Sequence, residues 1–400
     1  MKIVHVTTYA GGGASISARR LSDGLSALGV DSTLFTLDNL AGSVGVLERL
    51  RRGLAYHLAP DKYDGYTLTP QTEIFTHPFS LYDLVPKLKS ADVVHLHWIS
   101  RLVNHTTFFR RINKPVVWTL HDMNAFTGGC HYSEGCERYL NECKVCPQLP
   151  IEKQSEAERN FIIKKKALET LPKSTAVVAP SLWLHNMAKS SALLGRVTHF
   201  HVPYGIDLEN AFYPENKAAA RKSLGLGDKP TALFVADRLD SRWKGFSYLR
   251  QALKTLREKL DFQAVAVGGQ ANSDNDWVYL GRCDGDKMRA AYNAADVFVI
   301  PSVEDNLPNT PIEAAACGVP AVGFAAGGVP EIILTGRTGL VVPKGDVPAL
   351  AQAVLQLLKD PDMAKSMGVE ARKRAEVDFP LKKQAQAYLE LYKKALKAEP

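Results

Sequence analysis

The stretch that decides the fold reads Val297-Phe-Val-Ile-Pro-Ser-Val-Glu-Asp-Asn-Leu-Pro-Asn-Thr-Pro-Ile-Glu-Ala-Ala-Ala-Cys-Gly-Val-Pro-Ala-Val-Gly-Phe324. Its first four residues are apolar without alternation, which predicts a strand buried on both faces. A loop with two acids follows, and small residues then predict a helix that begins near Thr310 and carries Glu313 in its first turn. A second apolar run, 321–324, predicts the next strand. This order of elements is typical of parallel α/β structure.

The same pattern recurs on both sides of this stretch. The predicted strands are 2–7, 32–37, 93–97, 116–120 and 176–179 in the first half, and 232–236, 263–267, 297–300, 321–324 and 339–342 in the second. Strands that alternate with helices in this way predict an α/β protein with two Rossmann-like, doubly wound domains facing a cleft. A turn-rich segment, 203–214, divides them into residues 1–207 and 208–380. A last helix, 381–397, has apolar residues at helical spacing, so we expect it to pack back on the first domain.

Composition narrows the class of protein. The chain has 400 residues, of which 46% are hydrophobic and 23% charged, and this excludes disordered and fibrous proteins. The net charge, 49 Lys and Arg less 42 Asp and Glu, is +7, which is too small for a nucleic-acid binder but favours anionic substrates. The longest charge-free run, 314–330, is too short and too rich in Gly and Pro to span a membrane. Residues 1–13 lack the pattern of a signal peptide, so we expect a cytoplasmic protein.

Three glycines, 11–13, separate the first predicted strand from a helix that we expect to begin near Ser15. Such glycines let backbone N–H groups and the helix N-terminus approach a phosphate. We therefore expect Gly12 and Gly13 to contact a phosphate or sugar, the alternative being only a tight turn. Ile16 occupies the place of the third glycine of G-x-G-x-x-G, which disfavours a nicotinamide oxidoreductase.

Charged residues follow the first strand of the second predicted domain. Arg238 comes directly after that strand, and Lys244 stands where the next helix opens. The carboxyl end of a parallel strand faces the crevice where such folds bind ligands, so both could clamp a diphosphate. Asp305 and Glu313 could similarly hold hydroxyls of a sugar and a ribose, with the helix end receiving phosphate. The alternatives are a solvated loop and a carboxylate that merely favours a helix terminus.

These motifs together resemble glycosyltransferases of the GT-B fold, family 4, and in particular bacterial enzymes that assemble exopolysaccharides such as colanic acid. The resemblance covers nearly the whole chain. The motifs that carry it, in family order, are Gly11 to Gly13, Thr119-Leu-His-Asp122, Ala179-Pro-Ser181, Pro203-Tyr-Gly-Ile-Asp207, Arg238, Lys244-Gly245, Asp305 with Glu313, and Gly327-Gly-Val-Pro-Glu331.

The resemblance implies a retaining enzyme that transfers a sugar from a nucleoside diphosphate sugar to a saccharide or lipid-linked acceptor, without a cofactor or divalent cation in the chemistry. It assigns the diphosphate to Arg238 and Lys244, the ribose to Glu313 and the sugar to Asp305. The donor-binding set that it implies is Gly12, Gly13, Arg238, Lys244, Asn306, Leu307, Pro308, Asn309 and Glu313.

The chain departs from the family pattern in two places. Asp305 stands where the family has Glu, and Glu304 precedes it, so the sugar contact could pass to Glu304 or to the backbone of 306–309. Arg238 and Lys244 are six residues apart rather than five, which leaves Arg242 as an alternative phosphate ligand. These departures keep two rival functions open. One is a weakly active or non-catalytic sugar-nucleotide binding protein, and the other is an epimerase or phosphorylase of the same plan.

Histidines mark the strand ends of the first predicted domain. His121 follows strand 116–120, and the resemblance implies that it faces the transferred sugar, with Asp122 orienting its ring. His95 and His97 alternate with apolar residues and should point to one side of their strand. We assign His97 and Trp98, with Asp122, to the acceptor side; a histidine without a function is the alternative.

A cysteine-rich insertion, 128–147, follows His121 closely. It has the pattern C-x5-C-x6-C-x2-C, and four thiols in a reducing compartment predict a structural zinc site. The predicted ligands are Cys130, Cys136, Cys143 and Cys146. Disulfides or unpaired thiols are the alternatives, and a zinc ion here would fix a loop rather than perform chemistry.

Two basic clusters suggest peripheral contact with anionic lipids at the inner face of the cell membrane. One is Lys164-Lys165-Lys166, which follows the apolar run 161–163, and the other is Arg49 with Arg51 and Arg52. A basic and apolar surface of this kind binds anionic headgroups. The alternative is an ordinary solvated face.

Overall fold

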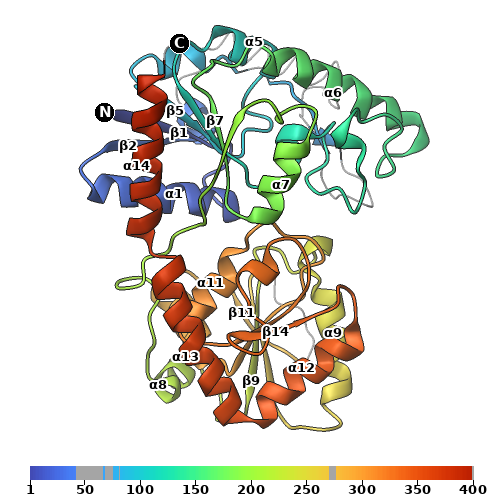
Figure 1. Ribbon diagram of the computed structural model, residues 1–400. Coiled ribbons are helices and arrows are strands. Elements are labelled where there is room, and N and C mark those ends of the chain that lie inside the picture. Colours follow the sequence, from blue (N-terminus) through green and yellow to red (C-terminus); the bar gives the residue numbers. More distant parts are fainter. Residues whose placement is uncertain (42–65, 68–74, 81, 270–275, 399–400) are drawn as a thin grey trace. The chain divides into compact units, whose positions relative to one another are not determined.

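The computed structural model describes residues 1–41, 66–67, 75–80, 82–269 and 276–398. The chain forms two compact units, one of Met1–Val202 with Gln384–Pro400 and one of Pro203–Lys383. Each unit holds a six-stranded parallel sheet with helices on both faces (Figure 1). The strand orders are β2-β1-β5-β6-β7-β8 and β11-β10-β9-β12-β13-β14. The predicted α/β class with two Rossmann-like, doubly wound domains is therefore confirmed. The N-terminal segment of the first unit ends at Val202, whereas the sequence placed the boundary between the domains at 207.

The four central strands of the first sheet are buried on both faces, whereas the edge strands β2 and β8 are partly exposed. Its strands are β1 (Lys2–Val6), β2 (Asp31–Phe35), β5 (Val93–Leu96), β6 (Val116–Thr119), β7 (Ala176–Ala179) and β8 (Thr198–His201). Helices α1 (Gly13–Ala27) and α14 (Leu381–Lys397) cover one face, and α5 (His105–Arg111), α6 (Gln154–Leu168) and α7 (Leu182–Ser190) cover the other (Figure 1). Within the described residues of this unit, the other regular elements, apart from 3-10 turns, are a short helix, α2 (Asp38–Ala41), and a two-stranded ribbon, β3 (Tyr66–Thr67) and β4 (Phe75–Thr76).

Period-two alternation decides which side chains of this sheet face α14. Ile3 in β1 and Val93 in β5 belong to the apolar cluster under α1 and α14, and their neighbours two residues on are His5 and His95. These two histidines are paired in the register of β1 and β5. The same face thus changes from aliphatic side chains to imidazoles toward the carboxyl ends of the strands.

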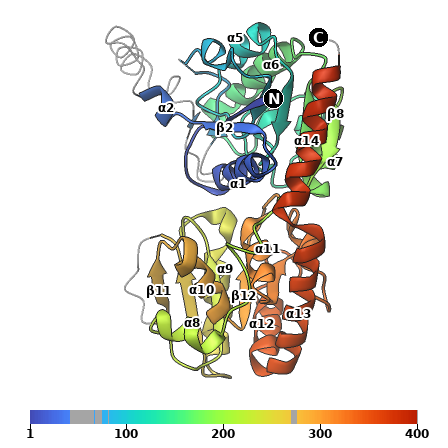
Figure 2. The ribbon, with the colours of Figure 1, turned by 90° about the vertical axis from the view of Figure 1, so that its left-hand side faces the viewer.

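Helix α14 returns the end of the chain to the first unit and lies along its sheet (Figures 1 and 2). Its buried residues include Ala385, Tyr388 and Tyr392, at helical spacing, as the sequence predicts. Leu396, which the prediction placed on the same face, is 43% exposed, because the buried face turns toward Ala395 instead.

The second sheet follows the same plan. Its strands are β9 (Thr231–Val235), β10 (Gln263–Val267), β11 (Val278–Gly281), β12 (Val297–Ile300), β13 (Ala321–Phe324) and β14 (Gly339–Val342). Helices α9 (Phe246–Leu256) and α12 (Val347–Lys359) pack together on one face, while α8 (Lys217–Ser223), α11 (Asn309–Ala316) and α13 (Pro361–Asp378) lie on the other (Figure 1). Helix α10 (Gly285–Ala294) packs beside α8 (Figure 2).

Short 3-10 turns supply the remaining regular backbone. They are η1 (Val85–Leu88), η2 (Asn124–Phe126), η3 (Arg138–Leu140), η4 (Ile151–Lys153), η5 (Arg242–Lys244) and η6 (Val329–Glu331). Residues 120–150, which hold the cysteine-rich insertion, contain η2 and η3 but no α-helix or named strand. The segment is held by scattered backbone hydrogen bonds, such as that from the N–H of Met123 to the carbonyl of His131 at 2.9 Å, rather than by a continuous ladder.

Candidate active site

In the second unit, the loop after β12 packs against the turn η5. The backbone N–H of Val303 donates to the carbonyl of Trp243 at 2.9 Å. Gly245 has φ +68°, and a Cβ on it would lie 1.9 Å from the carbonyl oxygen of Pro301. Only glycine permits both this conformation and this approach. The two segments that the sequence singled out therefore meet at the ends of β9 and β12.

Lys244 and Asp305 form an ion pair at this meeting point. The ammonium Nζ of Lys244 donates to Oδ2 of Asp305 at 2.6 Å, and Ser302 Oγ lies 3.2 Å from the same oxygen. The Asp305 side chain is 9% exposed, whereas that of Lys244 is 38% exposed. The carboxylate is thus held inside the protein, while the cation keeps a face to solvent.

The backbone of Asp305 is also fixed. Its carbonyl accepts a hydrogen bond from the N–H of Gly328 at 3.0 Å. Gly327 has φ +54°, and a Cβ there would lie 1.7 Å from the carbonyl oxygen of Asp305. The glycine pair of the Gly327–Glu331 motif therefore lets two loops approach each other at Asp305. The neighbouring acid, Glu304, instead lies 3.9 Å from Lys344.

Glu313 is held by a tyrosine that the sequence reasoning missed. Helix α11 begins at Asn309, not at Thr310, and no acidic residue lies in its first turn, so the expected first-turn position of Glu313 is wrong. The hydroxyl of Tyr292, which is fully buried, donates to Oε2 of Glu313 at 2.7 Å. Contact with Tyr292, rather than with the helix terminus, therefore orients this carboxylate. Asn306 and Leu307, ahead of the helix, are buried, and Pro308 is its N-cap.

The two candidate arginines make contacts on their own turn. Arg238 donates to both carboxylate oxygens of Asp240, at 3.1 and 3.0 Å. The guanidinium of Arg242 lies 5.6 Å from the ring centroid of Trp243. The Arg238–Asp240 pair lies on the surface, with the side chain of Arg238 56% exposed and that of Asp240 75% exposed.

The glycine loop of the first unit is open. Helix α1 begins at Gly13, two residues earlier than expected, and Gly12 at its N-cap has φ +85°. A Cβ at Gly11, Gly12 or Gly13 would meet nothing within 4 Å. The positive φ of Gly12 explains why a glycine stands at that position. Lack of space for a side chain explains none of the three glycines. Their contact with a phosphate or sugar stays a prediction.

Imidazoles form a continuous chain at the strand ends of the first unit. His5 Nδ1 lies 2.9 Å from His97 Nε2, and His97 Nδ1 lies 3.0 Å from His121 Nε2. At the other end, His5 Nε2 lies 3.1 Å from Ser32 Oγ. Strands β1, β5 and β6 thus align three rings that are far apart in the sequence.

His95 stacks beside this chain. Its ring centroid lies 4.1 Å from that of His97, which confirms that the two point to one side of their strand. Its nitrogens bond to hydroxyls, with Tyr392 Oη at 2.6 Å from Nδ1 and Thr119 Oγ1 at 2.7 Å from Nε2. Tyr388 Oη in turn lies 2.6 Å from Thr119 Oγ1. Helix α14 therefore supplies part of the polar cluster.

These histidines are neutral. Burial lowers the pKa of His5 to about 3 and, against the opposing charge of Asp122, that of His121 to about 4. Burial and the neighbouring rings hold the pKa values of His95 and His97 well below 6.5. A neutral imidazole has one donor and one acceptor nitrogen, so the chain must run in a single hydrogen-bond direction.

Among the described residues, His5, His95 and His97 are the one group whose three candidate ligand atoms lie within 4.8 Å of one another. Their ring nitrogens already bond to each other, to hydroxyls or to His121. A metal ion would have to break these bonds, so the arrangement is better described as a hydrogen-bonded network.

Asp122 orients other groups than the sequence predicted. Its Oδ2 accepts from Trp98 Nε1 at 2.9 Å and from His131 Nδ1 at 2.6 Å, and its Oδ1 accepts from the N–H of Asn124 at 2.8 Å. Burial opposes the charge, but His131 and the other donors hold the pKa of Asp122 below its usual value. The ring partner of His121 Nε2 is His97, whereas Asp122 fixes Trp98 and His131. Sequence reasoning missed His131 because it lies within the cysteine-rich insertion.

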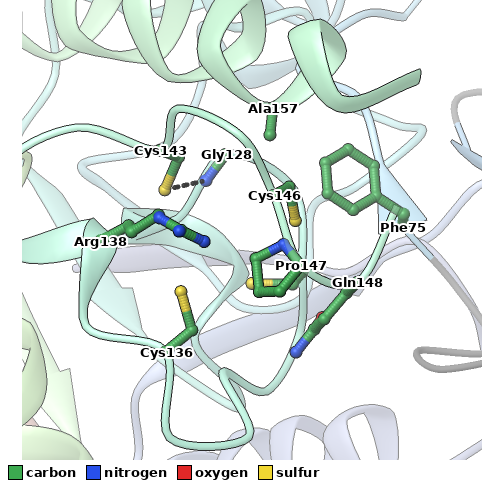
Figure 3. A pocket seen from close by; sticks show the side chains of 10 residues that line it. Phe75, Gly128, Cys136, Arg138, Cys143, Cys146, Pro147, Gln148 and Ala157 are labelled. Atoms are coloured by element: carbon green, nitrogen blue, oxygen red, sulfur yellow. Dashed lines mark hydrogen bonds between the residues drawn. The ribbon is translucent and has the colours of Figure 1, made fainter. Parts of the chain in front are cut away.

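The four cysteines of the insertion line one small cavity (Figure 3). They are Cys130, Cys136, Cys143 and Cys146, all in the free thiol form. The cavity has a volume of about 20 Å³. The fold therefore brings the predicted ligand set together around a common space.

One of the two basic clusters is not wholly on the surface. Lys164 is fully buried, and its Nζ donates to the carbonyls of Asn124 at 2.5 Å and Thr127 at 3.1 Å. Lys165 and Lys166 are exposed. The expected surface thus loses its first lysine, because helix α6 turns that residue toward the loop 124–127. The other cluster, Arg49 with 51–52, lies outside the described residues.

The chain has the GT-B fold, as comparison with solved structures shows. Sucrose-phosphate synthase from Thermosynechococcus elongatus superposes with a TM-score of 0.70 and 22% identity over 100% of both chains. Anabaena HepE in complex with UDP-glucose gives 0.67 and 17% over 98% of both chains. At these identities the likeness concerns the fold.

Sequence comparisons point to glycosyltransferases. Residues 229–360, from just before β9 to α12, match the family model described as "Glycosyl transferases group 1". A GDP-mannose-dependent alpha-(1-6)-phosphatidylinositol monomannoside mannosyltransferase of Mycolicibacterium smegmatis is 35% identical over 43% of this chain and 50% of its own length. The chain thus aligns with about half the length of that relative. A D-inositol 3-phosphate glycosyltransferase of Kineococcus radiotolerans is 26% identical over 96% of this chain and 91% of its own.

Proposed function

We propose that this protein is a retaining glycosyltransferase that moves a sugar from a nucleoside diphosphate sugar to a saccharide or lipid-linked saccharide acceptor in bacterial polysaccharide biosynthesis. The observation that carries the proposal is the Lys244–Asp305 pair, held at the strand ends of the unit that matches the family model. The nucleotide-sugar donor is supported by the UDP-glucose complex of HepE and by the GDP-mannose dependence of the mycobacterial relative. That relative's phosphatidylinositol-linked substrate supports a lipid-linked acceptor.

The chemistry assigned to the second unit is stabilisation of the departing diphosphate. The side chain of Lys244 is partly open to solvent and would move from Asp305 to a phosphate oxygen. Arg238 would leave Asp240 and bind a phosphate oxygen as well. The N-terminal N–H groups of α11 add partial positive charge. Groups that are aimed at developing negative charge stabilise the transition state without a divalent cation.

The carboxylates of the second unit would hold the rest of the donor. Asp305 would bind sugar hydroxyls, because Ser302 continues to hold its Oδ2 after Lys244 has turned to the phosphate. Glu313, whose carboxylate is oriented by Tyr292, would bind the ribose. The residues 306–309 would add backbone contacts.

In the first unit, we assign His121 to a sugar hydroxyl. A neutral imidazole whose Nε2 is hydrogen-bonded to His97 has a defined tautomer, which suits recognition of a hydroxyl group. His97 acts through that ring and is therefore a positioning residue. Trp98 and Asp122 are assigned to the acceptor side, where Asp122 fixes the indole.

A panel of nucleoside diphosphates and nucleotide sugars tests the donor class. A specific donor raises the Tm by mass action, and transfer to a saccharide or lipid-linked acceptor should follow with retention at the anomeric carbon, read by NMR. Absence of stabilisation by every nucleoside diphosphate would contradict the proposal. A product formed without acceptor would instead identify an epimerase.

A binding protein without transferase activity is the second candidate, and the ion pair is what favours it. Asp305 is already occupied by Lys244 at 2.6 Å, and its side chain is one methylene shorter than the Glu expected there. If the shorter acid limits catalysis, Asp305→Glu should raise turnover while leaving nucleoside diphosphate affinity unchanged. Donor binding with no transfer or donor hydrolysis in either protein would favour the binding function.

We further propose peripheral contact with anionic lipids through the exposed part of the basic cluster. None of the helices in the described ranges is long and apolar enough to cross a membrane. On α6, Lys165 and Lys166 are exposed, and Ile162 beside them is 46% exposed. Each lysine near an anionic surface contributes about 1 kcal/mol.

Vesicle co-sedimentation at low ionic strength tests this contact. The double variant Lys165→Ser with Lys166→Ser should lose binding to vesicles of anionic phospholipid. A matched double variant at two exposed lysines of the second unit, Lys359→Ser with Lys365→Ser, has the same charge change and should keep it. Equal binding of the two variants would refute the assignment to α6.

A further inference from the structure

The cavity in the cysteine-rich insertion has the size and lining of a metal site. Figure 3 shows thiols from separate turns of the chain around it, with Arg138 alongside. Its volume of about 20 Å³ is that of a single small occupant. A polar occupant of this size needs ligands on several sides, and four sulfurs provide them.

The backbone of the insertion is strained where it presents two of these thiols. Val145, between Cys143 and Cys146, has φ +49°, and Glu134 has φ +50°. These are two of the three non-glycine residues with positive φ in the described parts of the chain. A β-branched residue in this region is costly and persists only where other interactions over-determine it. A cross-link through the flanking thiols would do so.

Backbone donors point at the sulfurs. The N–H of Gly128 donates to Cys143 Sγ at 3.2 Å, and a Cβ on Gly128 would lie 2.9 Å from Cys143 Cβ (Figure 3). The backbone N–H groups of Gln148 and Leu149 interact with the Cys146 sulfur in the same way. Such N–H groups stabilise thiolate sulfur, the form in which cysteine binds metals, and they commonly support metal ligands from behind.

A buried cation near the cavity forms no ion pair with a carboxylate. Lys164 is fully buried and bonds to two carbonyls, and no ion pair of Lys164 with an acid is found in the described part of the chain. Its charge interacts most strongly with Cys130 and Cys143, and less with the carboxylate of Asp122. Buried charges are normally paired, so this lysine points to an anionic group among the sulfurs.

We propose that Cys130, Cys136, Cys143 and Cys146 bind one structural zinc ion. Four thiols lose four protons to solvent, the ion keeps its oxidation state, and the resulting centre carries a charge of about −2 that balances Lys164 and Arg138. No three of the sulfurs lie within 4.8 Å of one another, so binding must draw them inward to Zn–S distances of about 2.3 Å. The site fastens the loop that carries Asp122 and His131.

Metal analysis of the full chain, purified under reducing conditions without chelator, tests the proposal. We expect about one zinc per chain. The control Cys283→Ser with Cys317→Ser removes the two cysteines of the second unit and should keep the zinc, whereas Cys143→Ser with Cys146→Ser should lose it. A metal content below about one zinc in five chains, or disulfides found among these four cysteines by alkylation mapping without reductant, would overturn it.

Cobalt keeps the proposal testable if the cysteine variant does not fold. Replacement of the metal in the wild-type chain by Co²⁺ should give thiolate-to-cobalt charge-transfer absorption and the intense ligand-field bands of a tetrahedral site. Chelator should remove these bands and expose the four cysteines to alkylation. Bound cobalt without charge-transfer absorption would assign the metal elsewhere, for example to His5, His95 and His97, and would refute the cysteine site.

Discussion

The two sheets of this protein place ionisable groups at the same topological position but treat their charge in opposite ways. At the strand ends of the first unit, the buried His5 and His97 and the partly buried His121 are neutral and joined nitrogen to nitrogen. At the strand ends of the second unit, Lys244 and Asp305 form an ion pair with one partner partly exposed. The first arrangement avoids the cost of burying charge by losing protons, and the second avoids it by pairing.

This difference determines what each site can recognise. A row of neutral imidazoles offers hydrogen bonds but no net charge, which suits hydroxyl groups. A partly exposed lysine near a helix N-terminus suits an anion. One architecture thus presents two kinds of chemistry, and the following changes should separate them.

The largest effect should come from Lys244→Ala. Removing a cation aimed at the developing diphosphate should lower transfer about 100- to 1,000-fold while the fold survives. Steady-state rates with circular dichroism as the control for folding measure this. A turnover within a few-fold of wild type would remove Lys244 from the donor site.

Acid should destabilise the first unit through its neutral histidines. Because the folded-state pKa values of His5 and His121 are about 3 and about 4, stability is complete above about pH 6.5 and is lost as the pH falls toward those values. Each such group contributes a slope of up to about 1.4 kcal/mol per pH unit. Urea unfolding from pH 7 to pH 5 gives this slope.

The variant His97→Gln isolates one member of the chain. It removes one titrating ring while other buried histidines still contribute. The slope of stability against pH should therefore fall by the amount that corresponds to the uptake of about one proton on unfolding. His97→Gln should also lower transfer if His97 positions His121. Parallel stability curves for the variant and wild type would show that His97 is not neutral in the folded protein.

A smaller effect is expected where Tyr292 holds Glu313. Tyr292→Phe removes one hydrogen bond, about 1 kcal/mol, and should weaken nucleoside diphosphate binding about fivefold in calorimetry. Tyr248→Phe, on a tyrosine whose ring packs against Phe324, is the matched control and should bind normally. If Tyr292→Phe binds the nucleoside diphosphate as tightly as this control, then the orientation that Tyr292 gives to Glu313 is not needed for ribose binding.

The smallest effect should come from Arg282→Ala. Arg282 donates to Asp237 at 2.6 Å near the end of β9, but its side chain is 80% exposed. Exposed ion pairs contribute little, so stability should change by about 0.5 kcal/mol or less and transfer by no more than about twofold. A loss of transfer comparable to that of Lys244→Ala would show that the exposed Arg282 contributes to transfer as much as Lys244 does.

The sequence predicts all eight central strands but only two of the four edge strands. The central strands are buried on both faces and read as apolar runs. Of the edge strands, β2 and β14 were predicted, whereas β8 and β11 were not. In β8, histidines alternate with Thr198 and Phe200, and in β11 the apolar run 278–280 is only three residues long.

The sequence predicts which residues belong to the candidate site but not which of them contact each other. Lys244 and Asp305 are 61 positions apart, and no local pattern indicates that they pair. Tyr292 was missed for the same reason, whereas His131 was missed because its insertion was interpreted through its cysteines alone. The burial of Lys164 was within reach, because Ala157, Phe161, Lys164 and Leu168 recur at the spacing of one helix face. The three consecutive lysines suggested a surface and hid that signal.

The return of α14 to the first unit has a consequence for synthesis on the ribosome. Tyr392 bonds to His95, 297 residues earlier, and Tyr388 bonds to Thr119, 269 residues earlier. At about 5 to 20 residues per second, the polar cluster around His95 waits roughly 15 to 60 s for its tyrosines to be translated. The unit that begins first is therefore completed last, and until then its sheet exposes the apolar face that α14 will cover.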